Sequence, residues 1–206
     1  MILKAKHHFF FYPIMAAFVR IKLHKTFHTI QIKGDINDSG FPILMICNHI
    51  SWWDGIWAFN VNRKLYNRKF HFMMKEEQLK NNWFLSQAGG YSISSGSKSI
   101  TESLAYTVEL LADSNNMVLL FPQGEIYSMH NHEIDFRKGI EYILSKVKNK
   151  IQICFLANVV DFHSHVKPTV YSYIYDYHGS KTLSVLETSY NIFYKQCISE
   201  LAHIKY

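Results

Sequence analysis

The chain has 206 residues, enough for one hydrophobic core and few for two independent domains, so we expect a single domain over residues 1–206. Hydrophobic residues make up 48% of the chain and charged residues 18%, a composition that argues against intrinsic disorder. Lys and Arg outnumber Asp and Glu by 22 to 16, but the basic residues form no run typical of nucleic-acid binding. We therefore expect no nucleic-acid partner.

The N-terminal segment, residues 1–28, combines apolar and basic residues. Lys4 and Lys6 precede the apolar run Phe9–Val19, and no small-x-small cleavage site follows it. As a helix this run would rise roughly 16 Å, about half of a ~30 Å hydrocarbon core, and we expect Pro13 to interrupt it. A short apolar segment with basic flanks suits the membrane interface, where long basic side chains reach lipid phosphates. We expect it to form an interfacial helix; an ordinary buried N-terminal helix is the alternative.

Apolar runs typical of buried strands alternate with helical patterns along the rest of the chain. Strands are expected at Ile43–Cys47, Phe70–Met74, Met117–Phe121, Ile151–Ala157 and Val170–Tyr175. Helices are expected from a capping box at Ser99 and Glu102 to about Leu111, from about Phe136 to Val147, and from about Leu183 to Ile204. Strands that are apolar on both faces predict an α/β fold in which helices cover a sheet.

A histidine and a carboxylate follow the first of these strands, in the stretch ILMICNHISWWDG from Ile43 to Gly55. Within one helix, the side chains of His49 and Asp54 would diverge by about 140°, but His49 just before a helix can meet Asp54 in its first turns. The carboxylate would then bond one ring nitrogen and leave the other free to accept a proton. The spacing therefore predicts a dyad with His49 as general base.

A second polar loop, Phe121-Pro122-Gln123-Gly124-Glu125, follows the strand that begins at Met117. Proline and glycine together predict a tight turn at the strand end. In α/β sheets, ligand sites gather beyond the carboxyl ends of strands, so we expect this loop near the dyad. Backbone N–H groups near Gly124 are candidates for stabilising a tetrahedral oxyanion.

These motifs resemble those of the glycerolipid acyltransferase superfamily, of the 1-acylglycerol-3-phosphate acyltransferase type. NHISWWD is similar to its first block, Lys75–Ile93 to its second, and FPQGE with the later Phe-Arg-Lys-Gly to its third, over about residues 40–160. The resemblance implies that His49 deprotonates the hydroxyl or amine of a lipid acceptor and that Asp54 orients it. It also implies that Phe121, Pro122, Gln123, Gly124 and Glu125 hold the acceptor. The acyl group would come from coenzyme A or acyl carrier protein, with no metal or resident cofactor.

Two arginines of the family pattern are missing. The second block usually ends in an arginine where this chain has Ser95, and the third usually reads Phe-Pro-Glu-Gly-Thr-Arg, which places Gln123 at the glutamate and Ile126 at the arginine. Arginine is the natural bidentate partner of phosphate. We therefore expect the acceptor to be a lyso-aminolipid, a glycosylated or pigment lipid or another lipid alcohol rather than lysophosphatidic acid. Glu125 is a candidate to replace the family glutamate.

Other functions are open to the same residues. Cys47 precedes His49 by two positions and is a candidate acyl-accepting nucleophile, although a cysteine in an apolar strand is more often packed. The pairs His130/His132 and His163/His165 have spacing that could serve a metal-dependent hydrolase. A non-catalytic membrane-surface protein is a third possibility. Cys47, Cys154 and Cys197 are odd in number and far apart, which is typical of a reducing compartment and, with residues 1–28, predicts the cytoplasmic face of the cell membrane.

Overall fold

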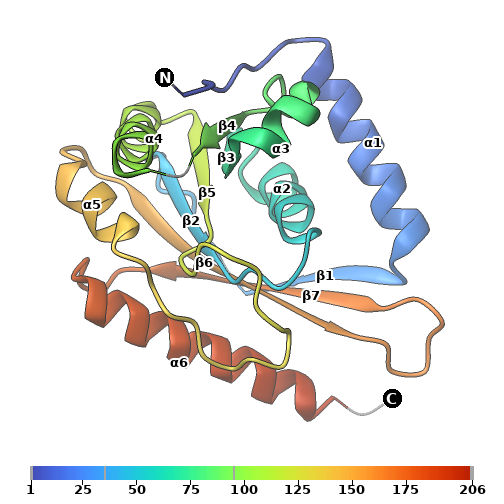
Figure 1. Cartoon of the computed structure of the whole chain (residues 1–206). Coiled ribbons are helices and arrows are strands. Elements are labelled where there is room, and N and C mark those ends of the chain that lie inside the picture. Colours follow the sequence, from blue (N-terminus) through green and yellow to red (C-terminus); the bar gives the residue numbers. More distant parts are fainter. Residues whose placement is uncertain (1, 35, 95, 205–206) are drawn as a thin grey trace.

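A seven-stranded sheet forms the centre of the protein in the computed structural model, which describes residues 2–34, 36–94 and 96–204 (Figure 1). The strand order is β1-β7-β6-β2-β5-β3-β4, and every pair is parallel except β6 with β7. The strands are β1 Thr29–Lys33, β2 Ile43–Cys47, β3 Lys69–Lys75, β4 Gly90–Ile93, β5 Asn116–Leu120, β6 Gln152–Asp161 and β7 Thr169–Tyr177.

Helices cover both faces of this sheet, so the predicted α/β architecture is confirmed (Figure 1). α1 and α2 pack on one face, and α4, α5 and α6 pack on the other. The helices are α1 Phe11–Thr26, α2 Asp54–Leu65, α3 Glu76–Asn81, α4 Ser97–Leu110, α5 Gly139–Lys146 and α6 Leu183–Ala202, with a short 3-10 turn η1 at Trp83–Leu85.

The central strand β2 is buried on both faces. Ile43, Met45 and Cys47 point into the core beneath α1 and α2, whereas Leu44 and Ile46 point into the core beneath α4, α5 and α6. Alternate residues of a strand face opposite sides, so a fully apolar run is what a strand between two helical layers requires. This burial fixes the register of β2 and hence the place where its carboxyl end delivers His49.

The five predicted strands are present with ends shifted by up to four residues, and two edge strands were missed. β1 is only half-buried and carries polar residues, and β4 has four residues, so neither forms an apolar run. The three predicted helices are also present. The capping-box prediction was wrong, because α4 begins at Ser97, two residues before Ser99, after a turn at Gly96 with a φ of 114°. Positive φ is accessible to glycine at little cost.

The N-terminal helix also differs from expectation. α1 runs through Pro13, which lies in the first turn, where a proline has no intrahelical hydrogen bond to break. The helix has 16 residues and so rises about 24 Å. Across the described ranges of the chain, no helix combines the length and the apolar character needed to cross a membrane.

Candidate active site

The carboxyl ends of β2 and β5 lie side by side. The two strands are parallel neighbours, and Ile46 is paired with Leu120. The residues that follow them, His49 and the loop 121–125, therefore leave the sheet at the same edge, as the sequence predicts. β6 lies on the other side of β2 and brings Asn158 to this edge.

His49 and Asp54 form the predicted pair. The chain turns after His49, and α2 begins at Asp54, so that Nδ1 of His49 lies 2.8 Å from Oδ2 of Asp54. The same carboxylate oxygen accepts the backbone N–H groups of Ile50 and Ser51, each at 2.7 Å. The Asp54 side chain is fully buried, while that of His49 is 21% exposed. The bond to Nδ1 leaves Nε2 as the nitrogen available for proton transfer.

Burial raises the pKa of Asp54, and the hydrogen bonds from His49, Ser51 and Ile50 oppose that rise. A carboxylate without these donors would be costly in such a position, because no water surrounds it. The network thus holds one acceptor beside the imidazole, and an anion there would stabilise the protonated form of that ring.

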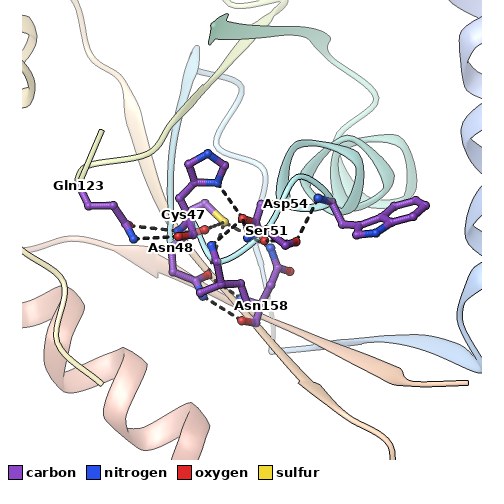
Figure 2. A network of polar contacts seen from close by, with 9 residues as sticks. Cys47, Asn48, Ser51, Asp54, Gln123 and Asn158 are labelled. Carbon is purple, nitrogen blue, oxygen red and sulfur yellow. Dashed lines mark hydrogen bonds and ion pairs between the residues drawn. The ribbon is translucent and has the colours of Figure 1, made fainter. Parts of the chain in front are cut away.

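The loop after β5 contacts His49 on its other side. The ring of Phe121 stacks on the imidazole, with centroids 3.9 Å apart and planes inclined by 10°. Gln123 is buried, accepts the N–H of His49 at 3.1 Å and donates to the carbonyl of His49 at 3.0 Å. Figure 2 shows Gln123 reaching the end of β2 from one side and Asp54 from the other. Of the five loop residues, Phe121 and Gln123 thus contact His49 directly.

Asn48 and Asn158 join β2 to β6 beneath the histidine. The amide of Asn48 donates to the carbonyl of Asn158 at 2.9 Å and accepts its N–H at 2.8 Å (Figure 2). Ser172 of β7 and the thiol of Cys47 complete this buried network. Asn48 directly precedes His49 in the sequence, which is a signal for its role at this site, whereas Asn158 lies in no recognisable motif.

The other loop residues form a small charged cluster at the surface. Arg137 donates from Nε to the carbonyl of Gln123 at 2.7 Å and from Nη2 to Glu125 at 2.7 Å. Gly124 has a φ of 71°, and a Cβ there would lie 2.9 Å from Cδ of Arg137, so glycine allows the arginine to cross the loop. Pro122 is buried and accepts the N–H of Arg137. Sequence reasoning missed Arg137, whose only signal was the Phe-Arg-Lys-Gly that follows the loop.

The loop also contains the backbone donor of Gly124, and the position of one missing family arginine directly follows the loop. The N–H of Gly124 donates to the carbonyl of Phe121 at 3.1 Å, so this one of the backbone donors near Gly124 is already engaged. Ile126 stands at the family arginine and is exposed. Ser95, the other substituted arginine position, lies outside the described residues.

Cys47 is poorly suited to act as a nucleophile. Its side chain is buried inside β2, and burial raises the pKa of the thiol well above its usual value. All three cysteines are buried and unbridged.

The two histidine pairs do not assemble a metal site with acidic or cysteine side chains. His130 and His132 lie in an exposed part of the loop before α5, whereas His163 bonds to Tyr171 and His165 stacks on His28. Among the described residues, no group of three or more His, Cys, Asp or Glu side chains could hold a metal ion. These positions give the hydrolase alternative no support.

Comparison with known proteins agrees with the motifs. A protein-family model described as Acyltransferase matches residues 20–156, about two thirds of the chain. The crystal structure of the 1-acyl-sn-glycerophosphate (LPA) acyltransferase PlsC from Thermotoga maritima superposes with a TM-score of 0.65 at 16% sequence identity. The match covers 94% of this chain and 80% of that one. A search of curated proteins found none that match.

The solved structure shares the fold, and the family model spans both His49 and the loop 121–125. The chain therefore belongs to the Acyltransferase family and is an acyltransferase.

Proposed function

We propose that this acyltransferase moves a fatty acyl group from a thioester of coenzyme A or acyl carrier protein to a lyso-lipid or lipid-like acceptor, with His49 as general base. The observation that carries the proposal is the 2.8 Å contact between Nδ1 of His49 and the buried carboxylate of Asp54. A fixed Nδ1–H leaves the lone pair of Nε2 for the acceptor proton.

The reaction needs no resident cofactor in this proposal. The oxygen of the acceptor hydroxyl attacks the thioester carbonyl carbon while Nε2 of His49 takes the hydroxyl proton. The tetrahedral intermediate then collapses, the C–S bond breaks, and the imidazolium returns its proton to the leaving thiolate. Asp54 stays ionised throughout and stabilises the imidazolium. An amine acceptor would follow the same steps.

The acceptor in this proposal lacks a phosphomonoester. Ile126 supplies no charge at the position of the family arginine, and the guanidinium of Arg137 is paired with Glu125 at 2.7 Å. A loop whose basic and acidic side chains neutralise each other attracts a dianionic phosphate weakly. This balance supports a lyso-aminolipid, a glycosylated or pigment lipid or another lipid alcohol as acceptor.

The protein would reach such acceptors by resting on the cytoplasmic face of a membrane. Phe11, Ile14, Phe18 and Ile21 recur at helical spacing on α1 and are all exposed, while Val19 and Leu23 pack into the core. We call these four exposed residues the outer apolar face of α1. Exposed apolar rows of this kind mark membrane or protein contacts.

Charge around α1 supports the same attachment. A groove of about 920 Å³ between α1 and α2 is lined by Arg20, Lys25, Arg63 and Lys64, and no acidic residue is among those that line it in the described part of the chain. A cationic groove beside an exposed apolar face matches the anionic surface of a cytoplasmic leaflet.

A thioester-release assay across a panel of lyso-lipids and lipid alcohols tests the proposed function. Wild type should release thiol only with a matching acceptor, and His49→Ala should lower kcat by about 100- to 10,000-fold. Unchanged turnover in His49→Ala would refute the assigned base. Lysophosphatidic acid as the best acceptor would refute the acceptor class while leaving the base in place. A parallel assay with EDTA separates this reaction from the metal-dependent alternative.

A further inference from the structure

Gln123 makes two hydrogen bonds to the backbone of a single residue. Its Oε1 accepts the N–H of His49 at 3.1 Å, and its Nε2 donates to the carbonyl of His49 at 3.0 Å. The side chain is 0% exposed, so both bonds are shielded from water. Figure 2 shows the pair of contacts between Gln123 and the end of β2. The carboxamide therefore fixes the peptide groups on both sides of the Cα that carries the imidazole.

The loop around Gln123 is itself anchored. The backbone carbonyl of Gln123 accepts the Nε–H of Arg137 at 2.7 Å. The N–H of Tyr127 donates to the carbonyl of His49 at 2.8 Å. Phe121, two residues earlier, covers one face of the imidazole. The backbone of His49 is thus held from the β5 loop while its ring is held by Asp54 from α2.

An amide matches these two partners, whereas an ionised carboxylate does not. A carboxamide offers one acceptor and a donor, whereas an ionised carboxylate offers acceptors alone. A glutamate at this position would satisfy the N–H of His49 but would turn a second oxygen toward its carbonyl. Two facing acceptors without a proton between them repel each other, and burial strengthens the repulsion.

We propose that Gln123 is a positioning residue that sets the place of the general base His49, and that it does not contact the acceptor. This inference rests on the proposed role of His49. It reassigns Gln123 from the acceptor-holding loop, because the polar atoms of its side chain are both directed at His49 and none is exposed. Gln123 then acts through the histidine rather than on the substrate.

Two substitutions separate positioning from acceptor binding. Gln123→Met keeps the length of the side chain and removes both hydrogen bonds. We expect kcat to fall by about 10- to 100-fold with KM for the acceptor unchanged, since a displacement of about 1 Å can cost about 100-fold. A raised KM with unchanged kcat would overturn the proposal, because it would place Gln123 against the acceptor.

Gln123→Glu tests the positioning role through the pH dependence of activity, which a merely structural role would leave unchanged. The introduced carboxyl reproduces both bonds only while it is protonated, and burial raises its pKa. Wild-type activity should persist at high pH, whereas the variant should lose activity as its introduced carboxyl ionises. The exposed Gln196 of α6 provides the matched control, Gln196→Glu, which should keep the wild-type profile. A variant profile of wild-type shape would overturn the proposal.

The outcome is distinguishable from failure of the proposed function. If His49→Ala retains full turnover, the assigned base is wrong whatever the Gln123 variants do. If His49→Ala is inactive and both Gln123 variants match wild type in kcat and pH profile, only the positioning role fails. Melting temperatures identify a variant that does not fold; should Gln123→Met be such a variant, the pH profile of Gln123→Glu decides.

Discussion

The ring of Phe121 lies flat against the imidazole of His49, with the two planes inclined by only 10°. One face of the imidazole is therefore covered by an apolar ring, which limits the rotation of the imidazole and excludes water from that side. An imidazolium formed during turnover would also benefit from the negative face of the aromatic ring.

Replacing Phe121 with leucine should weaken both effects without opening a large cavity. We expect kcat to fall by about tenfold, because the bond to Asp54 at 2.8 Å still orients the ring. Phe162→Leu, at an exposed phenylalanine in the loop between β6 and β7, serves as the control and should leave kcat unchanged. Steady-state thiol release measures both variants, and equal kcat values would contradict a role for the stack.

Asp54→Asn should reduce turnover while preserving most of the volume of the side chain. An amide cannot accept from Ile50, Ser51 and His49 as the carboxylate does, and it provides no negative charge for the imidazolium. We expect kcat to fall by about 100- to 10,000-fold. Thiol release and a thermal melt should be measured together, and a folded variant with near-wild-type turnover would refute the dyad.

Cys47→Ala should retain catalysis and lose stability. The thiol is buried, and its raised pKa disfavours the thiolate that a ping-pong mechanism would need. Removing the sulfur leaves Asn158 with one hydrogen bond fewer and creates a small void, so the melting temperature should fall. An acyl-enzyme detected by mass spectrometry in wild type and absent in Cys47→Ala would instead establish Cys47 as the nucleophile.

The dyad and its loop could be predicted from the sequence because both depend on short-range signals. His49 and Asp54 lie five residues apart, with the start of a helix at Asp54. Proline and glycine in the loop 121–125 predict a tight turn. Both motifs lie beyond the carboxyl ends of their strands, because ligand sites of parallel α/β sheets gather there. Both motifs also occur in one family pattern, which predicts that they belong to one site.

The remaining contacts depend on registers that a single sequence does not reveal. Asn158 reaches Asn48 only because β6 pairs with β2, and Arg137 reaches Gln123 only because the chain folds back over Gly124. β1 and β4 are edge strands; β1 is half-buried with polar residues and β4 has only four residues, so neither has the apolar pattern of the central strands. Pro13 was expected to interrupt the N-terminal helix but lies in its first turn, where a proline removes no intrahelical hydrogen bond. The destabilisation caused by a proline thus depends on its position within the helix.

Stability should decrease in acid because the partly buried His7 lies against the buried His71. The rings of His7 and His71 lie 4.6 Å apart, and burial lowers the pKa of each to about 4. Both are neutral in the folded state but take up protons near pH 6.5 when unfolded. Their contribution to stability is therefore complete above about pH 6.5 and is lost as the pH falls toward 4.

Urea titrations at pH 7.5 and pH 5 check this expectation. The free energy of unfolding of wild type should be lower at pH 5, and His71→Met should show a smaller loss between the two conditions. Lys69 lies near both histidines and Asp113 near His71, and all the proteins compared retain these two charged residues. His132→Met, at an exposed histidine, should keep the wild-type difference. Identical differences in all three proteins would contradict the assignment.

The outer apolar face of α1 should contribute directly to membrane binding. Ile14 and Ile21 are more than half exposed, and inserting such side chains beneath lipid headgroups contributes about 1.5 kcal/mol or more each. Ile14→Gln/Ile21→Gln should therefore lower the partition coefficient onto anionic vesicles at least about tenfold. Sedimentation with vesicles of phosphatidylcholine and phosphatidylglycerol measures the change.

A matched pair on α6 shows whether this effect belongs to α1 alone. Val185 and Ile192 are also exposed apolar residues, but α6 lies on the opposite face of the sheet (Figure 1). If α1 faces the lipid, Val185→Gln/Ile192→Gln leaves vesicle binding unchanged, because those side chains stay in water in both states. Equal losses from both double variants would show that binding reflects general surface hydrophobicity. Added salt weakens binding further if Arg63 and Lys64 contact headgroups, since screening acts on the charges of the groove and not on the apolar face.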